Sequence, residues 1–205
     1  MSGPIPQAAR LLVGAWKNWR NQTRIDYREV ALGLRAGPGV QVMARSQIDG
    51  GTTIGAWTYV GYSCAIGRAS IGRYCSIANL VSIGPGEHWK PGRVATSTGF
   101  VDDVFASLTA ADVSLGNDVW VGVGAVVRRG VSVGNGAIIG ANSFVNRDVP
   151  PFAIVAGAPA GVVRFRFEPE ERALIEQAAW WDLDLAEARI RVRALENELR
   201  RRVQR

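Results

Sequence analysis

The chain has 205 residues, of which 47% are hydrophobic and 20% are charged, and its formal net charge is +6. This composition supplies enough apolar material for one sizeable core and excludes a disordered or collagen-like chain. One histidine and two cysteines exclude a disulfide framework and any metal site that needs two or three imidazoles from one chain.

No apolar run is long enough for a helix that crosses a bilayer, and the first residues lack the pattern of a secretory signal. We therefore expect a cytoplasmic protein with no membrane span. Nearly all of the positive charges are arginines, and they are scattered along most of the chain. Because no aromatic residues are interleaved among them, this pattern favours a solvated surface and no nucleic-acid partner.

The segment 1–38 is predicted to form a helical cap. Apolar residues at helical spacing run from Ile5 to Trp19 and indicate an amphipathic helix. Lys17, Arg20 and Arg24 add positive charge to it. Such a helix either covers the open end of the repeat that follows or lies on a membrane surface, and of these two roles the first is favoured.

The middle of the chain, residues 39–163, repeats with a period of six. A branched aliphatic residue recurs at Val42, Ile48, Ile54, Val60, Ile66, Ile71, Ile77 and Ile83, and again at Leu115, Val121, Val127, Val133, Ile139 and Val145. The residue two positions earlier is always small or β-branched, and residues two apart on a strand point to the same face. The period therefore predicts an all-β domain, a parallel β-helix of about four to five coils with stacked aliphatic ladders.

The two cysteines, Cys64 and Cys75, occupy small inward positions of the hexads. Their separation is not one full coil, so the two thiols are not expected to stack. We interpret them as buried, inert thiols rather than metal ligands or a disulfide.

The six-residue period fails over residues 85–112, which are predicted to form an excursion loop. Insertions at the corners of a solenoid often form its functional face. The chain's one histidine, His88, lies at the start of this loop. Taken alone, a histidine in a loop is as often without a role as with one.

The segment 164–205 returns to helical spacing. Pro169 is well placed to begin a helix that ends near Trp180–Trp181, and Asp184 has the position of a cap for a second helix. An apolar stripe follows over Leu185–Leu199. This stripe fits a short coiled-coil seam, a contact with the chain's own coil or a contact with a neighbouring subunit.

Several segments carry a family resemblance. They are Ile71–Ile77, the Gly-rich lead-in to His88, Leu115–Gly122, Ile138–Ser143, Asp148–Phe152, Val155–Ala160 and Trp180–Asp182. Together they resemble the hexapeptide-repeat acyltransferases, and within them the xenobiotic acetyltransferase branch, which includes enzymes that inactivate chloramphenicol or streptogramins. The resemblance implies that the β-helix is left-handed, a handedness that the period itself does not give.

The resemblance also implies an activity. A member of this family is an acetyl-CoA-dependent O-acetyltransferase, with His88 as the general base in this chain. A neutral imidazole suits that role because its unperturbed pKa lies near neutrality. Transfer would be direct, without a metal ion and without a Ser or Cys nucleophile. The resemblance further implies a homotrimer, with coenzyme A in a groove between neighbouring subunits.

Six further residues match the family's cofactor-binding positions. They are Trp120, Val123, Ala141, Asn146, Arg147 and Arg164. By this match Trp120 lies against the pantetheine arm, and Val123 and Ala141 meet that arm through backbone groups. The other three lie toward the adenosine phosphates. Gly161 departs from the family, which has Lys or Arg there, so we expect Arg164 to carry the phosphate contact alone.

The acceptor is expected to be a small molecule or a saccharide, and the residues do not distinguish the two. One alternative function is N-acetylation or another acylation of a nucleotide-linked amino sugar. The other is a catalytically inactive β-helix scaffold, which would bind no acetyl-CoA.

Overall fold

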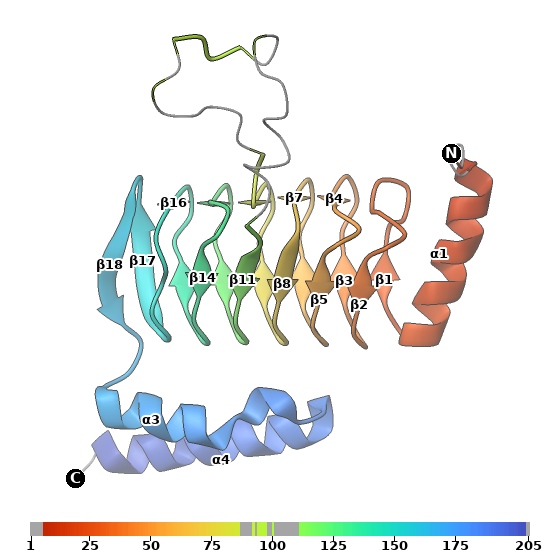
Figure 1. Cartoon of the computed structure of the whole chain (residues 1–205). Coiled ribbons are helices and arrows are strands. Elements are labelled where there is room, and N and C mark those ends of the chain that lie inside the picture. Colours follow the sequence, from red (N-terminus) through yellow and green to blue (C-terminus); the bar gives the residue numbers. More distant parts are fainter. Residues whose placement is uncertain (1–5, 87–91, 93, 98–99, 101–110, 204–205) are drawn as a thin grey trace.

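The hexads fold into a parallel β-solenoid (Figure 1). The computed structural model describes residues 6–86, 92, 94–97, 100 and 111–203. A complete coil contributes one short strand to each of three sheets, and its strands pair in parallel with those one coil further on. The last strand, Ala160–Phe165, instead turns back and runs antiparallel to the strand before it. The predicted parallel β-helix is therefore confirmed.

The three sheets form three faces, which are numbered in the order in which a coil meets them. Face 1 has eight strands: β1 (Arg24–Ile25), β3 (Gln41–Val42), β6 (Tyr59–Val60), β9 (Ser76–Ile77), β12 (Trp120–Val121), β15 (Ile138–Ile139), β17 (Ala153–Gly157) and β18 (Ala160–Phe165). Face 2 has five strands: β4 (Gln47–Ile48), β7 (Ala65–Ile66), β10 (Ser82–Ile83), β13 (Val126–Val127) and β16 (Phe144–Val145). Face 3 also has five: β2 (Arg35–Ala36), β5 (Thr53–Ile54), β8 (Ala69–Ile71), β11 (Val113–Leu115) and β14 (Ser132–Val133). The chain turns from face 1 to face 2 at the first corner, from face 2 to face 3 at the second corner, and back to face 1 at the third corner.

The core consists of the aliphatic ladders that the period predicts. Ile48 is in register with Ile66, Leu115 with Val133, and Val121 with Ile139, and all six side chains are buried. The smaller inward residues are buried as well. Where they carry hydroxyl groups, those groups bond to the corners: Ser46 Oγ and Thr52 Oγ1 donate to the carbonyl oxygens of Gly61 and Gly67, both at 2.9 Å. The interior thus buries no unpaired hydroxyl at these two positions.

The solenoid begins earlier than the period indicates. Strands β1 and β2 lie within the segment predicted as a cap, and they pair in parallel with β3 and β5. Face 1 therefore contains one strand from each of six coils between β1 and β15, rather than four to five. Ala36 is in register with Ile54 at the full step of three hexads, whereas Ile25 is in register with Val42 at a step one residue shorter, so the six-residue period is broken before Ile25 is reached.

Helix α1 (Gln7–Asn21) lies across the open end of the solenoid (Figure 1). Arg10 Nη2 donates to the carbonyl oxygen of Val30 at 2.9 Å, and Asn18 Nδ2 donates to that of Ile25 at 2.9 Å. Through these contacts, side chains of α1 donate hydrogen bonds to backbone carbonyl oxygens of the first coil. The favoured role of this helix, as a cover for the open end, is confirmed.

The opposite end of the solenoid leads into three C-terminal elements: helix α3 (Pro169–Ala178), the 3-10 helix η2 (Trp180–Asp182) and helix α4 (Leu185–Val203). Helix α3 begins at Pro169, as predicted, and Asp184 Oδ1 accepts a hydrogen bond from a backbone N–H in the first turn of α4. No helix in the described ranges is long and apolar enough to cross a membrane.

The apolar stripe of α4 packs on its own chain. Ala188 and Leu195 are buried, and Leu199 packs against a small second core that contains Phe152 and Ile175. Figure 1 shows α3 and α4 side by side along one edge of the solenoid. Of the three contacts predicted for this stripe, the contact with the chain's own fold is the one observed.

Candidate functional site

The excursion loop leaves the solenoid at the second corner, between β10 and β11. Its central part, with His88, lies outside the described residues. Its two ends are held by arginines from neighbouring coils: Arg129 Nε donates to the carbonyl oxygen of Pro85 at 3.1 Å, and Arg68 Nη2 donates to Asp112 Oδ2 at 3.2 Å. The structure thus fixes where the loop begins and ends.

Neither Arg68 nor Arg129 was singled out from the sequence, although the period contains the signal. Ile66, Ile83 and Val127 are in register on face 2. The residues that follow them at equal distance therefore share the second corner. An arginine two positions beyond such an aliphatic residue is consequently placed beside the root of the loop.

A groove of about 670 Å³ opens at the foot of this loop. Its floor is the outer surface of face 2, with the side chains of Gln47, Ala65 and Ser82. Asp49, Gly86 and Arg129 line it from the second corner. Gly86 stands two residues before His88 in the sequence. The groove therefore offers hydroxyl, amide, carboxylate and guanidinium groups at the point where the chain leads into the predicted general base.

Trp120 and Arg164 lie on one line across face 1. Trp120 is in register with Ile138, Ile138 with Ile154, and Ile154 with Arg164. Three steps between strands separate the two ends of this line, or about 14 Å at about 4.8 Å per step. The indole is 46% exposed and the guanidinium side chain is also exposed. The structure thus brings two of the predicted cofactor residues onto the same face.

Val123 and Ala141 lie next to this line, on adjacent rungs of the first corner. The amide N–H of Asn142 donates to the carbonyl oxygen of Val123 at 2.8 Å. The approach is close at Gly122, where a Cβ atom would lie 2.5 Å from the amide nitrogen of Ala141. Within the described part of the chain, the amide N–H groups of Val123 and Ala141 donate no hydrogen bond. Two backbone donors are therefore free at an exposed corner.

Asn146 and Arg147 lie elsewhere, at the second corner beside the root of the excursion loop. Val145 is in register with Val127, so Asn146 and Arg147 stack on the arginines at 128 and 129. The side-chain oxygen of Asn146 is shielded from solvent and accepts no hydrogen bond from the residues that the structure describes. In a single chain, face 2 separates these two residues from Val123 and Ala141. The six predicted residues therefore form two groups and not one site.

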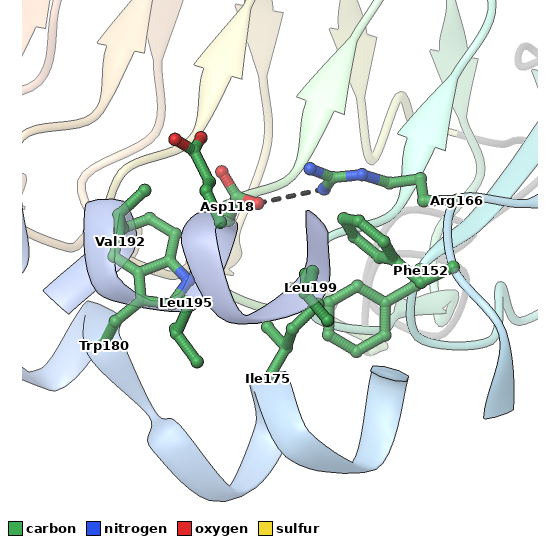
Figure 2. A pocket seen from close by; sticks show the side chains of 10 residues that line it. Asp118, Phe152, Arg166, Ile175, Trp180, Val192, Leu195 and Leu199 are labelled. Carbon is green, nitrogen blue, oxygen red and sulfur yellow. Dashed lines mark hydrogen bonds and ion pairs between the residues drawn. The ribbon is translucent and has the colours of Figure 1, made fainter. Parts of the chain in front are cut away.

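A second cavity of about 350 Å³ lies between the third corner and the C-terminal helices (Figure 2). Its walls are mostly apolar, with Phe152, Ile175 and Trp180 among them. At one side Arg166 Nη1 donates to Asp118 Oδ2 at 2.9 Å. Burial raises the pKa of the Asp118 carboxyl, and the hydrogen bond from Arg166 opposes that rise. None of the predicted cofactor residues lines this cavity.

Two of the segments that carry the family resemblance meet beside this cavity. Arg73 Nη1 donates to the carbonyl oxygen of Asp182 at 2.7 Å, and Tyr74 Oη donates to that of Leu183 at 2.9 Å. The rings of Tyr74 and Trp180 lie 5.2 Å apart. These segments therefore attach the C-terminal helices to the solenoid, which is a structural role.

The two cysteines are buried and unpaired, as predicted. Burial raises the pKa of the Cys64 thiol, and it raises the pKa of the Cys75 thiol to about 12. Both groups are therefore protonated and unreactive near neutral pH. Among the described residues, no group of three or more His, Cys, Asp or Glu side chains could hold a metal ion.

The sequence of this chain is similar to those of known proteins. The family described as "Bacterial transferase hexapeptide (six repeats)" matches residues 112–147. A chloramphenicol acetyltransferase from Morganella morganii is 34% identical over 130 residues, which cover 58% of this chain and 62% of that protein. One from Agrobacterium fabrum is 46% identical over 74 residues, covering 36% and 35% respectively. The matches thus span less than two thirds of the length of these relatives.

Solved structures show the same solenoid. A variant of perosamine N-acetyltransferase from Caulobacter crescentus, in complex with CoA and GDP-perosamine, is 26% identical with a TM-score of 0.52, over 66% of this chain and 52% of that one. A hexapeptide-repeat acetyltransferase from Vibrio cholerae, complexed with acetyl coenzyme A, is 24% identical with a TM-score of 0.57, over 78% and 88%. The resemblance to hexapeptide-repeat acyltransferases, and to the chloramphenicol acetyltransferases among them, is confirmed.

Proposed function

We propose that this chain, which shares its hexapeptide solenoid with bacterial acetyltransferases, is itself an acetyl-CoA-dependent acetyltransferase. It transfers an acetyl group to a hydroxyl of a small-molecule or sugar acceptor. The observation that carries the proposal is the 34% identity to a chloramphenicol acetyltransferase over 130 residues. The loop with the chain's one histidine, rooted beside an open groove, supports it.

His88 is proposed as the general base. Acetyl-CoA supplies the acetyl group as a thioester. With the acceptor in the groove at the foot of the loop, the His88 imidazole takes the proton from the acceptor hydroxyl as its oxygen bonds to the acetyl carbon. The C–S bond then breaks, and the imidazolium returns the proton to the leaving thiolate. Proton and acyl group are both accounted for, so no nucleophile on the protein is needed.

The outer surface of face 1 and the first corner are proposed to hold acetyl-CoA. The exposed indole of Trp120 offers a flat apolar surface for the pantetheine arm. The free amide N–H groups of Val123 and Ala141 suit the amide oxygens of that arm, or the oxyanion that develops on the acetyl carbonyl. Arg164, at the far end of the same line, suits a phosphate group. The residues that the structure describes therefore fit this ligand.

A homotrimer is proposed because one chain does not assemble the whole site. Asn146 and Arg147 lie at the second corner, opposite face 1, and a neighbouring subunit can bring its second corner against face 1 and the first corner of this one. Cyclic symmetry then repeats the same contact three times. Light scattering should give a mass three times that of the 22.1 kDa chain. A monomer that transfers acetyl groups would contradict this assembly.

N-acetylation of a nucleotide-linked amino sugar is the second candidate function. The observation that favours it is the likeness to perosamine N-acetyltransferase, which was crystallised with GDP-perosamine. A screen that follows thiol release from acetyl-CoA distinguishes the candidates. Release with chloramphenicol or a sugar alcohol supports O-acetylation, and release only with amino sugars supports N-acetylation. No release with any acceptor, and no coenzyme A binding in calorimetry, would identify an inactive scaffold.

A further inference from the structure

Helix α1 turns its apolar stripe away from the protein. Leu12 is 73% exposed, Trp16 is 53% exposed and Trp19 is 80% exposed. Within the helix only Gly14 is buried. A helix on the surface of a globular protein ordinarily buries its apolar stripe and exposes its polar one. Helix α1 does the reverse.

The first coil of the solenoid explains why α1 is oriented in this way. The first coil presents backbone carbonyls that have no strand above them, and these need donors. Arg10 and Asn18 donate to two of them, and Lys17 Nζ donates to a third, the carbonyl oxygen of Leu32. Gly14 lies so close to the solenoid that a Cβ there would stand 2.7 Å from Tyr27 Cδ2.

These contacts fix the direction in which the apolar stripe points. At about 100° per residue, the residues that contact the coil and the apolar residues are centred about 150° apart around the helix axis. The apolar stripe consists of Leu11, Leu12, Ala15, Trp16 and Trp19, all of them exposed. It therefore faces outward from the end of the solenoid, where Figure 1 shows no other element.

The charge of this region selects one kind of partner. Between Gln7 and Ile25 there is no acidic residue, whereas Arg20 and Arg24 are both exposed. The Arg20 guanidinium lies 5.2 Å from the ring of Trp16, so positive charge directly borders the apolar stripe. Two copies of such a surface would repel each other. An anionic lipid surface attracts it, and tryptophan and leucine beside arginine are typical of helices that lie in the membrane interface.

We propose that α1 docks the protein onto an anionic lipid surface, with Leu11, Leu12, Trp16 and Trp19 at the boundary between headgroups and acyl chains. The helix lies on this surface and does not span it. The stripe that covers the coil and the stripe that meets the lipid are on opposite sides, so both contacts are made at once. This surface is separate from the proposed acetyl-transfer site and does not depend on that function.

Vesicle flotation with the full-length chain tests the proposal. Wild type should bind vesicles of phosphatidylcholine and phosphatidylglycerol mixed in equal amounts, should bind pure phosphatidylcholine more weakly, and should dissociate as salt is raised. Leu12→Glu should lower the partition constant by about tenfold or more, the scale set by burying one leucine side chain. Ile190→Glu is the matched control, because Ile190 is 71% exposed on α4 and Leu12 is 73% exposed. It should leave binding unchanged apart from the small effect of one added charge.

Quenching by lipids with brominated acyl chains gives the orientation. Tryptophan fluorescence should be quenched on binding, and the double variant Trp16→Phe/Trp19→Phe should lose most of the quenching while still binding. The proposal is wrong if wild type does not bind the mixed vesicles, or if Leu12→Glu and Ile190→Glu bind equally well. It is also wrong if wild type does not bind vesicles and instead self-associates in a way that Leu12→Glu abolishes. The apolar stripe of α1 would then be covered by a second copy of the chain.

Discussion

Replacing Trp120 with alanine should weaken acetyl-CoA binding by about tenfold and leave the fold intact. The side chain is 46% exposed, so nearly half of its surface is available to a ligand. A tryptophan can bury up to about 250 Å², which leaves about 115 Å² here and, at about 25 cal/mol per Å², an upper limit of about 3 kcal/mol. A narrow pantetheine arm that covers about half of this area contributes about 1.4 kcal/mol, which is a factor of ten.

The measurement is the KM for acetyl-CoA at saturating acceptor, followed by thiol release. Tyr59→Ala is the matched control, because Tyr59 is 37% exposed on the same line of face 1, two strands from Trp120. The melting temperature should not change in either variant, since both side chains point outward from the core. An unchanged KM in Trp120→Ala would refute the assignment of this part of face 1 to the cofactor, and an equal rise in both variants would refute a specific contact with Trp120.

Three further outcomes are expected. Arg164→Ala should raise the Kd for coenzyme A in calorimetry by about five- to tenfold with a smaller change in kcat, as loss of a charge-assisted contact to phosphate predicts; an unchanged Kd would remove Arg164 from the site. Gly161→Lys should lower that Kd several-fold, because a Cβ at Gly161 meets no atom within 4 Å and the new charge lies near Arg164. A higher Kd, which means weaker binding, would refute the family comparison at this position. Ellman's reagent should react with neither thiol in the folded protein, and rapid reaction at pH 8 would contradict their burial. Because burial raises the pKa of Cys75 to about 12, the free energy of unfolding should fall as the pH rises from about 8.5, where a free thiol ionises, toward about 12.

Much of the fold follows from the period of six. A strand of two residues is too short to be recognised from a local pattern. The recurrence of Val42, Ile48 and Ile54 nevertheless fixes which residues point inward. The same recurrence fixes the register between coils, because residues three hexads apart must stack. The ladders were therefore predictable in detail. The place of Arg164 was not, because β18 turns back antiparallel to β17 with a register shift between Ile154 and Val155, which the period does not encode.

The first coil and the direction of α1 were not predictable in this way. One missing residue between Ile25 and Val42 breaks the period, although the backbone still pairs. Helical spacing identifies an amphipathic helix but does not say which stripe faces the protein. Here the unpaired carbonyls of the coil decide, because they require donors such as Arg10 and Asn18, and an apolar stripe offers none.

The candidate site was predictable only in part. Family resemblance singles out Asn146 and Arg147 with Val123 and Ala141, but the sequence does not show that a single chain holds them at different corners. That separation appears once each residue is assigned to a corner. Arg68 and Arg129 cannot be recognised from a local pattern, because a single arginine at a corner has none, and only the register of the coils places them at the root of the loop.

The most direct test of the proposed mechanism is the turnover of His88→Ala with the acceptor that the thiol-release screen identifies. General-base assistance is worth about 10²- to 10⁴-fold, so kcat should fall by that factor. Coenzyme A should still bind in calorimetry with a Kd close to that of wild type, because Trp120, Ala141 and Arg164 lie on face 1 and the first corner, away from the root of the loop. A His88→Ala variant that keeps near-normal turnover would contradict the mechanism.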